Sequence, residues 1–310
     1  MRNPRDLVAG GRRRARREYE QFRDGGWLQK LPRQRFLDFA YRAILGRPVD
    51  SGGAAHFSAL MDQGTGRDEV LDMLRSSAEA TQRPAASDEA ALHRCRQAFV
   101  RSFPRAARIL DLGGTDLNDR QGALVTLGYP YDFDELVIID LPSDERHQSY
   151  ASEEIQDRVQ TSRGPVGYRY HSMADLSGIE DASFDLVYSG QTFEHVTPDD
   201  GHAVLAEARR VLEPGGHLCL DTPNRIVTEL QLRGTGEQYI DPDHEIEYTH
   251  SQMLELFAQH GYEVVRSHGL GLMGQSVTED RFDAAELRRS NGLYDHIEAC
   301  YLLAYVCRVP

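Results

Sequence analysis

Residues 105 to 310 predict an α/β fold, a doubly wound sheet with helices on both faces. Short apolar runs typical of buried strands alternate with amphipathic helical stretches in this part of the chain. The first run ends in a glycine turn, and acidic residues end or follow several of the others. The seven runs span residues 108–112, 136–139, 166–170, 184–189, 217–220, 263–266 and 301–308.

Helical stretches separate most of the expected strands. Apolar residues at helical spacing predict helices over residues 202–212 and 251–260, and a helix over about 89–103 leads into the first strand. Residues 283–289 are the only candidate for a helix between the last two strands.

The N-terminal part of the chain predicts a small module of two or three short helices. Residues 46–48, Gly-Arg-Pro, interrupt the helical pattern, and residues 81–88 have the composition of a linker. We therefore divide the chain into a basic N-terminal segment with a helical module, 1–85, and a second domain, 86–310. The apolar residues at helical spacing are Phe36, Phe39, Ala40 and Ile44, then Val70, Leu71 and Leu74.

The composition of this 310-residue chain excludes several classes of protein. No apolar run approaches the roughly 18 residues that a membrane span needs. The charged start has no apolar segment behind it, so it does not read as a secretory signal. The four cysteines lie far apart without CxxC spacing, which disfavours a zinc finger and a disulfide framework. We expect a reducing, cytoplasmic setting.

The net charge of −14 is distributed unevenly. Residues 1–50 carry 13 Arg and Lys against 6 Asp and Glu, whereas the remaining residues carry 22 against 43. An acidic body repels polyphosphate backbones, so nucleic acid is not the expected partner. The arginine run at residues 12–17 is interpreted as a solvated helix face, with contact to an anionic membrane or RNA as the alternative. The expected binding partner is a small molecule or a glycan.

Two strand ends offer groups that could bind a ligand. Asp111, Gly113 and Gly114 follow the first apolar run, and glycines there let the backbone approach a ligand closely. Thr115 and Leu117 stand where the dinucleotide fingerprint has further glycines, so the turn alone is also compatible with a structural role. Asp140 ends the second run, where an acid can accept hydrogen bonds from ribose hydroxyls or cap the next turn.

Later strand ends repeat this arrangement, with Asp175 after the third run and Ser189 and Gly190 at the end of the fourth. Together with the strand Phe-Asp-Leu-Val and the turn Leu-Glu-Pro-Gly-Gly at 212–216, they resemble class I S-adenosylmethionine-dependent methyltransferases from about residue 105 to 310. The resemblance implies a Rossmann-like seven-stranded doubly wound sheet with an antiparallel last strand, beside the small N-terminal helical domain. It also implies a cofactor set of Asp111, Gly113 and Gly114 at the methionine moiety, Asp140 at the ribose, Asp175 at the adenine amino group, and Leu141, Ser189 and Gly190.

A glutamate and two histidines form the sharpest local pattern. Gln191, Glu194 and His195 directly follow the fourth strand, and His244 lies in the later segment Asp-His-Glu-Ile-Glu-Tyr-Thr. Carboxylate oxygens and imidazoles suit a divalent cation. The pattern resembles the metal-dependent branch of the superfamily, the small-RNA 2′-O-methyltransferases and the ubiquinone-pathway O-methyltransferases, in which it reads Glu-x-x-Glu-His.

This second resemblance implies metal ligands Glu194, His195, His244 and Gln191, with Mg²⁺ as the expected ion. Glu194, His195 and His244 are then the expected catalytic residues. Gln191 replaces a carboxylate with an amide, which predicts a weaker or differently occupied site. A metal-free pocket with His195 as general base and a structural role for the motif are the alternatives.

The expected function is transfer of a methyl group from S-adenosylmethionine to a hydroxyl of a saccharide or polysaccharide precursor, assisted by the cation. The stretch at 41–53 resembles a bacterial domain of unknown function that is similar to the phycobilisome-linker unit and is often attached to glycan-modifying enzymes. Tyr239, Tyr248 and Tyr294 could stack on sugar faces. The alternatives are a metal-free methyltransferase for a phenolic or amine metabolite and a non-catalytic cofactor-binding scaffold.

Two further expectations concern the whole chain. Every strand-end motif lies after residue 105, so the helical module is expected to be dispensable for cofactor binding. The oligomeric state is left open, a homo-oligomer included.

Overall fold

The structure is a computed structural model, which describes residues 31–45, 47–75, 77, 79, 87–116, 119–146 and 154–310. The basic segment with its arginine run, Gly46 of the expected helix break, and most of the expected linker lie outside the described residues. Within the described part, no helix is long and apolar enough to cross a membrane.

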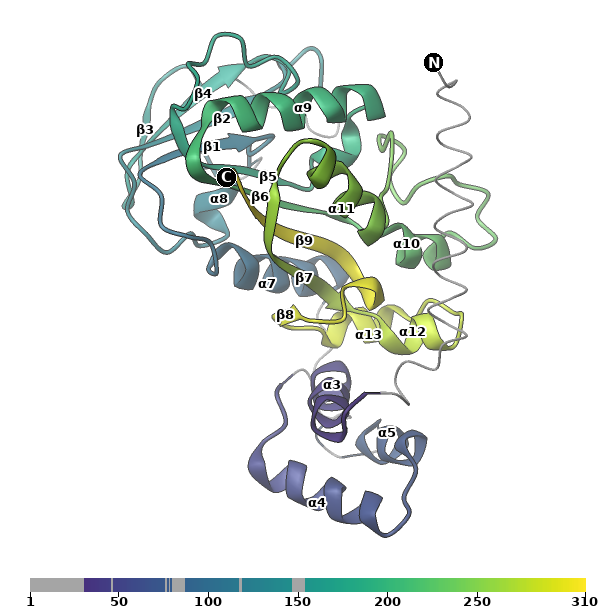
Figure 1. Cartoon of the computed structure of the whole chain (residues 1–310). Helices are drawn as coiled ribbons and strands as arrows, with labels where there is room; N and C mark the ends of the chain where they lie inside the picture. The colour runs from purple at the N-terminus through teal and green to yellow at the C-terminus, as the bar shows by residue number, and fades with distance from the viewer. Residues whose placement is uncertain are drawn as a thin grey trace.

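Among the described residues, the N-terminal module contains three helices, α3 (Arg33–Leu45), α4 (Ser51–Asp62) and α5 (Arg67–Arg75). Asp50 caps α4, because its side chain accepts a hydrogen bond of 2.8 Å from the Gly53 backbone N–H. Figure 1 shows the three helices as a lobe at the end of the molecule where β8 and α13 lie.

In the part of the chain that the structure describes, the sheet contains nine strands in the order β3-β4-β2-β1-β5-β6-β9-β7-β8. The strands β4, β2, β1, β5 and β6 are parallel, and β9 pairs antiparallel with both β6 and β7, so the antiparallel last strand is found. The seven expected strands correspond to β1 (Arg108–Leu112), β2 (Glu135–Asp140), β4 (Pro165–Tyr170), β5 (Phe184–Gly190), β6 (Leu212–Pro223), β7 (Glu263–Leu272) and β9 (Cys300–Arg308).

The prediction of seven strands was too low by two. The additional strands are β3 (Val159–Gln160) and β8 (Leu293–Tyr294), which pair antiparallel at the two edges of the sheet. Two residues are too few to produce the period-2 alternation by which a strand is predicted. The Gly215 turn, with φ of +83°, lies within the range of β6.

Helices cover both faces of the sheet, as a doubly wound fold requires. Ile109 and Ile138 pack into one buried cluster with α7 and α8, whereas their neighbours Leu110 and Ile139 pack into a second with α9 and α11. The helices are α7 (Asp88–Val100), α8 (Ala123–Thr126), α9 (Pro198–Val211), α10 (Arg225–Gln231), α11 (His250–Gln259), α12 (Gly274–Thr278) and α13 (Ala284–Arg289).

The helical module shares its apolar core with the far end of this sheet. Phe36 and Phe39 of α3 belong to the same buried cluster as Leu272, Tyr294 and Cys300 of the sheet. The Phe39 ring also meets the His296 ring edge to face, with ring centres 5.5 Å apart. The helical module therefore packs against the sheet domain, residues 86–310, and is not joined to it by the linker alone.

Candidate active site

The first strand ends in a turn that only glycine can form. Gly113 has φ of +75°, and an added Cβ would lie 2.2 Å from the Thr192 Cγ2 atom. A Cβ on Gly114 would lie 2.1 Å from a carboxylate oxygen of Asp111. The backbone N–H of Gly113 donates to the Ile139 carbonyl at 2.7 Å, which holds the turn against the end of β2. Both predicted glycines are therefore required by close approaches at the carboxyl ends of β1 and β5.

Several buried polar atoms at this edge lack a hydrogen-bond partner among the described residues. They are the hydroxyls of Thr115 and Ser189. The carboxylate oxygens of Asp111 also make no short hydrogen bond, although the Leu124 backbone N–H is near enough to lower the pKa of this carboxyl. Buried polar groups are normally paired, and unpaired ones need an explanation. The methionine moiety of S-adenosylmethionine carries an ammonium group, which would donate to the Asp111 carboxylate, and a carboxylate, which would accept from the two hydroxyls. The residues at this edge thus fit that cofactor.

Burial raises the pKa of Asp111 to about 7, although the Leu124 backbone N–H and the Arg96 guanidinium oppose the shift. Because this pKa exceeds the value of about 4 in an unfolded chain, the folded protein holds more protons than the unfolded one between about pH 4 and 7. The contribution of Asp111 to stability is therefore present at low pH and is lost as the pH rises through about 7.

We expect Asp111→Asn to reduce this pH dependence in the cofactor-free protein. The free energy of unfolding of the wild type should fall between pH 6 and 8 by about 1 kcal/mol more than that of the variant. Thermal melts at the two pH values measure the difference, and calorimetry should find weaker binding of S-adenosylhomocysteine. Equal pH slopes would show that Asp111 does not titrate in this range.

Asp140 lies at the end of β2, as predicted, with its side chain 18% exposed. Its Oδ1 atom accepts a hydrogen bond of 2.8 Å from the Leu141 N–H and lies 3.5 Å from the Arg146 Nε atom. The Arg146 guanidinium lies over the Tyr170 ring. Leu141 is 37% exposed, which is unusual for leucine and offers an apolar surface beside the carboxylate.

We expect Asp140→Ala to weaken S-adenosylhomocysteine binding by about 1.5–3 kcal/mol, the range for a hydrogen bond to a charged group. Isothermal titration calorimetry measures the change. Asp175→Ala is measured beside it, because Asp175 is an exposed acid that is also predicted to bind the cofactor. Unchanged affinity in the Asp140 variant would remove this residue from the cofactor site.

Asp175 is exposed and acts locally as a cap. Its Oδ1 atom accepts a hydrogen bond of 3.0 Å from the Ser177 N–H, and hydrogen bonds from Ser177 lower the pKa of the carboxylate. Its contact with adenine stays a prediction.

A buried network behind the strand ends was not predicted from the sequence. Arg96 of α7 donates to Asp221 of β6 at 2.9 Å and to the Tyr188 hydroxyl at 3.0 Å, and Tyr188 donates to Asp221 at 2.8 Å. The Gln191 side-chain N–H donates to the same carboxylate at 3.1 Å. Asp221 thus orients Gln191, whose φ is +57°, and leaves the amide oxygen as the atom of that side chain that can bind a cation.

The acidic residue and the two histidines of the predicted metal site come together in the structure. One ligand atom from each of Glu194, His195 and His244 lies within 4.8 Å of the others. Glu194 and His195 belong to the 3₁₀ helix η2 (Phe193–His195) after β5, whereas His244 lies in the segment before α11. The Glu194 carbonyl accepts from the backbone N–H groups of Glu245 and Ile246, at 2.9 and 3.2 Å, which joins the two segments.

Hydrogen bonds orient both imidazole rings. His195 Nδ1 lies 3.2 Å from the Asp243 carbonyl oxygen, and His244 Nδ1 lies 2.9 Å from the Glu247 Oε1 atom. Both acceptors require the proton on Nδ1 of a neutral ring, so Nε2 is the nitrogen that bears the lone pair. This is the usual arrangement of metal-binding histidines, and with a carboxylate and an amide oxygen nearby the residues fit a divalent cation.

Burial shifts the pKa values of all three residues of this cluster. It raises the pKa of Glu194 to about 7, against the opposing effects of His244 and of a 2.9 Å hydrogen bond from Thr222. Burial and the neighbouring His244 lower the pKa of His195. Burial also lowers the pKa of His244, but the hydrogen bond to Glu247 and the charge of Glu194 outweigh it, and the net shift is upward. His195 is therefore neutral near pH 7.

Two of the three tyrosines expected to stack on sugars are not available for stacking. Tyr248 is buried against the Phe193 ring, and Tyr294 is buried in the core shared with the helical module. Tyr239 is half-buried beneath the Arg225 guanidinium. Aromatic residues in sequence serve the apolar core as readily as a binding face.

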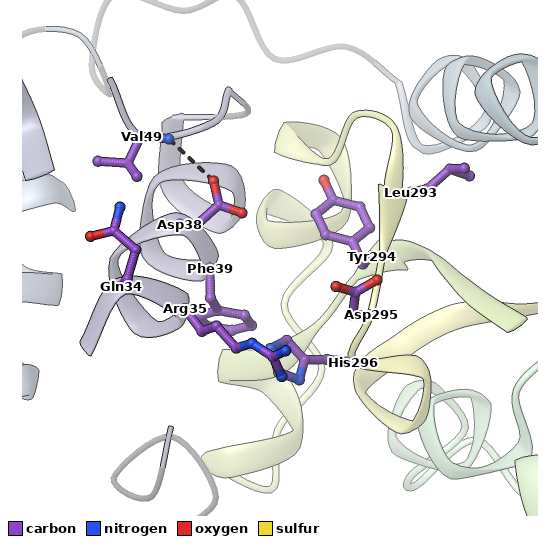
Figure 2. Close-up of a pocket in the computed structure, with 9 residues that line it drawn as sticks. All are labelled: Gln34, Arg35, Asp38, Phe39, Val49, Leu293, Tyr294, Asp295 and His296. Carbon is purple, nitrogen blue, oxygen red and sulfur yellow. Dashed lines mark hydrogen bonds between the residues drawn. The ribbon is translucent and has the colours of Figure 1, made fainter. Parts of the chain in front are cut away.

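A cavity of about 450 Å³ lies between the helical module and the body. Figure 2 shows Arg35 and Phe39 of α3 on one side and Asp295 and His296 on the other. Tyr294 lines this cavity, but none of the predicted cofactor or metal residues does. The strand-end site is thus defined by its side chains and not by this cavity.

Comparisons with known proteins find a methyltransferase family over part of the sheet and a second family over the helical module. Residues 133–220 match a family described as a methyltransferase domain, and residues 28–83 match a domain of unknown function, DUF4214. A ubiquinone biosynthesis O-methyltransferase from Xanthomonas oryzae pv. oryzae is 39% identical over 75 residues, which are 24% of this chain and 30% of that protein.

Two further proteins show the extent of the similarity. A Mycolicibacterium smegmatis protein named as a probable S-adenosylmethionine-dependent methyltransferase is 36% identical over 111 residues, 34% of this chain and 40% of that protein. A solved SAM-dependent methyltransferase structure from Thermotoga maritima aligns with 71% of this chain and 90% of that one, with a TM-score of 0.49 and 17% identity.

The family match and the methyltransferase relatives support a class I S-adenosylmethionine-dependent methyltransferase, as predicted. The chain spans less than half the length of the two curated relatives. The match to DUF4214 agrees with the predicted resemblance of the helical module to a domain of unknown function. Membership of the metal-dependent branch and the similarity to a phycobilisome linker stay predictions.

Proposed function

We propose that this protein transfers a methyl group from S-adenosylmethionine to a hydroxyl oxygen, with a divalent cation held by Glu194, His195, His244 and Gln191. The acceptor is a saccharide or a polysaccharide precursor. The convergence of Glu194, His195 and His244 after the end of β5 carries the proposal. The name of the Xanthomonas relative, an O-methyltransferase, supports transfer to oxygen.

Each group of residues has one task in this reaction. Asp111 and Asp140 bind the cofactor at the ends of β1 and β2, and the Glu194 cluster orients the acceptor beside it. When bound, the cofactor supplies a methyl carbon on a positively charged sulfur, and the cation lowers the pKa of the acceptor hydroxyl. The hydroxyl oxygen then forms a bond to the methyl carbon as the carbon–sulfur bond breaks, and its proton leaves to water.

Two features support a saccharide acceptor. Adjacent hydroxyls of a sugar supply two oxygen ligands, which a cation held by few protein oxygens needs. The chain after residue 50 carries 43 acidic against 22 basic residues, which favours an uncharged acceptor over a polyanion.

One observation favours a second candidate function. The lowered pKa keeps His195 neutral near pH 7, and a neutral imidazole at the end of β5 can take a proton directly. In that case the protein is a metal-free methyltransferase, and a phenolic or amine metabolite is the acceptor. A third candidate, a non-catalytic cofactor-binding scaffold, follows from Thr115, which stands in the sequence where the dinucleotide fingerprint has a further glycine.

Methyl transfer with and without a chelator distinguishes the three. The protein is incubated with isotope-labelled S-adenosylmethionine and one of methyl α-D-mannopyranoside, catechol or phenethylamine, and products are measured by mass spectrometry. Labelled glycoside that EDTA abolishes and Mg²⁺ or Mn²⁺ restores is the expected result. Labelled catechol or amine in EDTA supports the second candidate. Cofactor binding without any transfer supports the scaffold.

A further inference from the structure

Glu247 is a buried carboxylate directly behind the candidate cation site, and its side chain is 0% exposed. Its Oε1 atom accepts hydrogen bonds from the Ile240 N–H and from His244 Nδ1, both at 2.9 Å. Its Oε2 atom accepts from the Thr228 hydroxyl and, at 3.4 Å, from the Arg225 guanidinium. Four donors on two segments, α10 and the stretch before α11, thus hold one carboxylate in a fixed position.

We propose that Glu247 is a positioning residue for the cation site, which it serves by accepting the Nδ1–H of His244. The inference rests on the proposed function, since positioning matters only where His244 binds a ligand. A carboxylate can only accept hydrogen bonds, so it requires the proton of a neutral His244 on Nδ1 and the lone pair on Nε2. Its negative charge also makes the imidazole a stronger ligand.

The two carboxylate oxygens have separate partners, which links His244 to α10. Arg225 and Thr228 of α10 hold Oε2, and Arg225 also donates to the Gln238 carbonyl at 2.7 Å. Hydrogen bonds from α10 therefore hold the segment 238–247 at both of its ends. The orientation of His244 depends on this support as well as on its own backbone.

The test measures cation binding and the His244 tautomer in Glu247→Gln. An amide can donate as well as accept, so the variant keeps the shape of the side chain and loses the requirement for Nδ1–H. The matched control is Glu286→Gln. Glu286 is also a buried carboxylate, which accepts from the Gln275 and Ser276 backbone N–H groups and the Ser276 hydroxyl, and it belongs to α13 and not to the cation site.

Two readouts are used. Electron paramagnetic resonance of free Mn²⁺ gives the affinity for the ion, and ¹⁵N NMR of histidine-labelled protein at pH 9 gives the tautomer of His244. We expect Glu247→Gln to bind Mn²⁺ about 10–100-fold more weakly, the usual effect of removing such a support. S-adenosylhomocysteine affinity should stay unchanged, and Glu286→Gln should bind Mn²⁺ as the wild type does.

The wild-type spectrum keeps the test decisive even if the variant does not fold. A wild-type His244 protonated on Nε2 overturns the proposal, and so does unchanged Mn²⁺ affinity in a folded Glu247→Gln protein. A wild type that binds no Mn²⁺ overturns the cation site of the proposed function. If His244 is then still protonated on Nδ1 and loses this preference in Glu247→Gln, the positioning role is supported by itself.

Discussion

His244→Ala should lower turnover by several orders of magnitude and leave the affinity for S-adenosylhomocysteine nearly unchanged. The imidazole belongs to the cluster with Glu194 and His195, whereas Asp111 and Asp140, two acids predicted to bind the cofactor, lie on β1 and β2. Steady-state kinetics and calorimetry on the same preparation measure the two effects. EDTA should abolish wild-type activity, and added Mg²⁺ or Mn²⁺ should restore it.

His260→Ala is the matched control for this variant. His260 also pairs with a histidine, since its Nε2 atom lies 2.9 Å from His202 Nδ1, but this pair is exposed on α9 and the end of α11. Its replacement should leave turnover unchanged. Full activity in EDTA, with His195→Ala alone inactive, would instead identify His195 as a metal-free general base.

A chain shortened to begin at Ser87 should be much less stable than the full chain. This expectation reverses the one drawn from the motifs, because α3 buries Leu272, Tyr294, Ala299 and Cys300, each at most 4% exposed. Exposing a buried apolar side chain costs about 1.5–3 kcal/mol, and a whole domain is stable by only about 5–15 kcal/mol. Thermal melts and the solubility of the shortened chain measure the effect.

Single substitutions test the same interface in the full chain. Phe39→Ala removes the ring that meets His296 and should lower the melting temperature of the whole protein in one transition. Met73→Ala is the control, because Met73 is 42% exposed on α5. A shortened chain that melts like the full chain and binds S-adenosylhomocysteine equally well would restore the view of the module as dispensable.

The parallel strands could be predicted because strands buried on both faces are continuous apolar runs. The first run, residues 108–112, agrees with β1 at both ends. Elements too short to show a period were missed, among them β3, β8 and the seven-residue α10. Such short elements show no hydrophobic period in the sequence, because they are stabilised by tertiary contacts.

The candidate site likewise contains residues that the sequence predicts and contacts that only the tertiary structure defines. Glu194 and His195 are adjacent in sequence, and His244 lies in a segment of polar residues that resembles a known motif, so the cluster could be predicted. The Arg96–Asp221 pair joins residues 125 positions apart, and no local signal connects them. The contact of Glu247 with His244 depends on the turn of the chain between them, which spacing alone does not define.

The position of β9 has a consequence for how this chain folds during synthesis. Residues 300–308 lie between β6 and β7 in the sheet, so β7 and β8 have no strand that joins them to β6 until that late strand is made. Cys300 also completes the apolar core around Phe36 and Phe39, which are made more than 250 residues earlier. Contacts of such long range slow folding. The emerging helices therefore keep apolar side chains exposed for most of translation, when a nascent chain is most exposed to aggregation and depends most on chaperones.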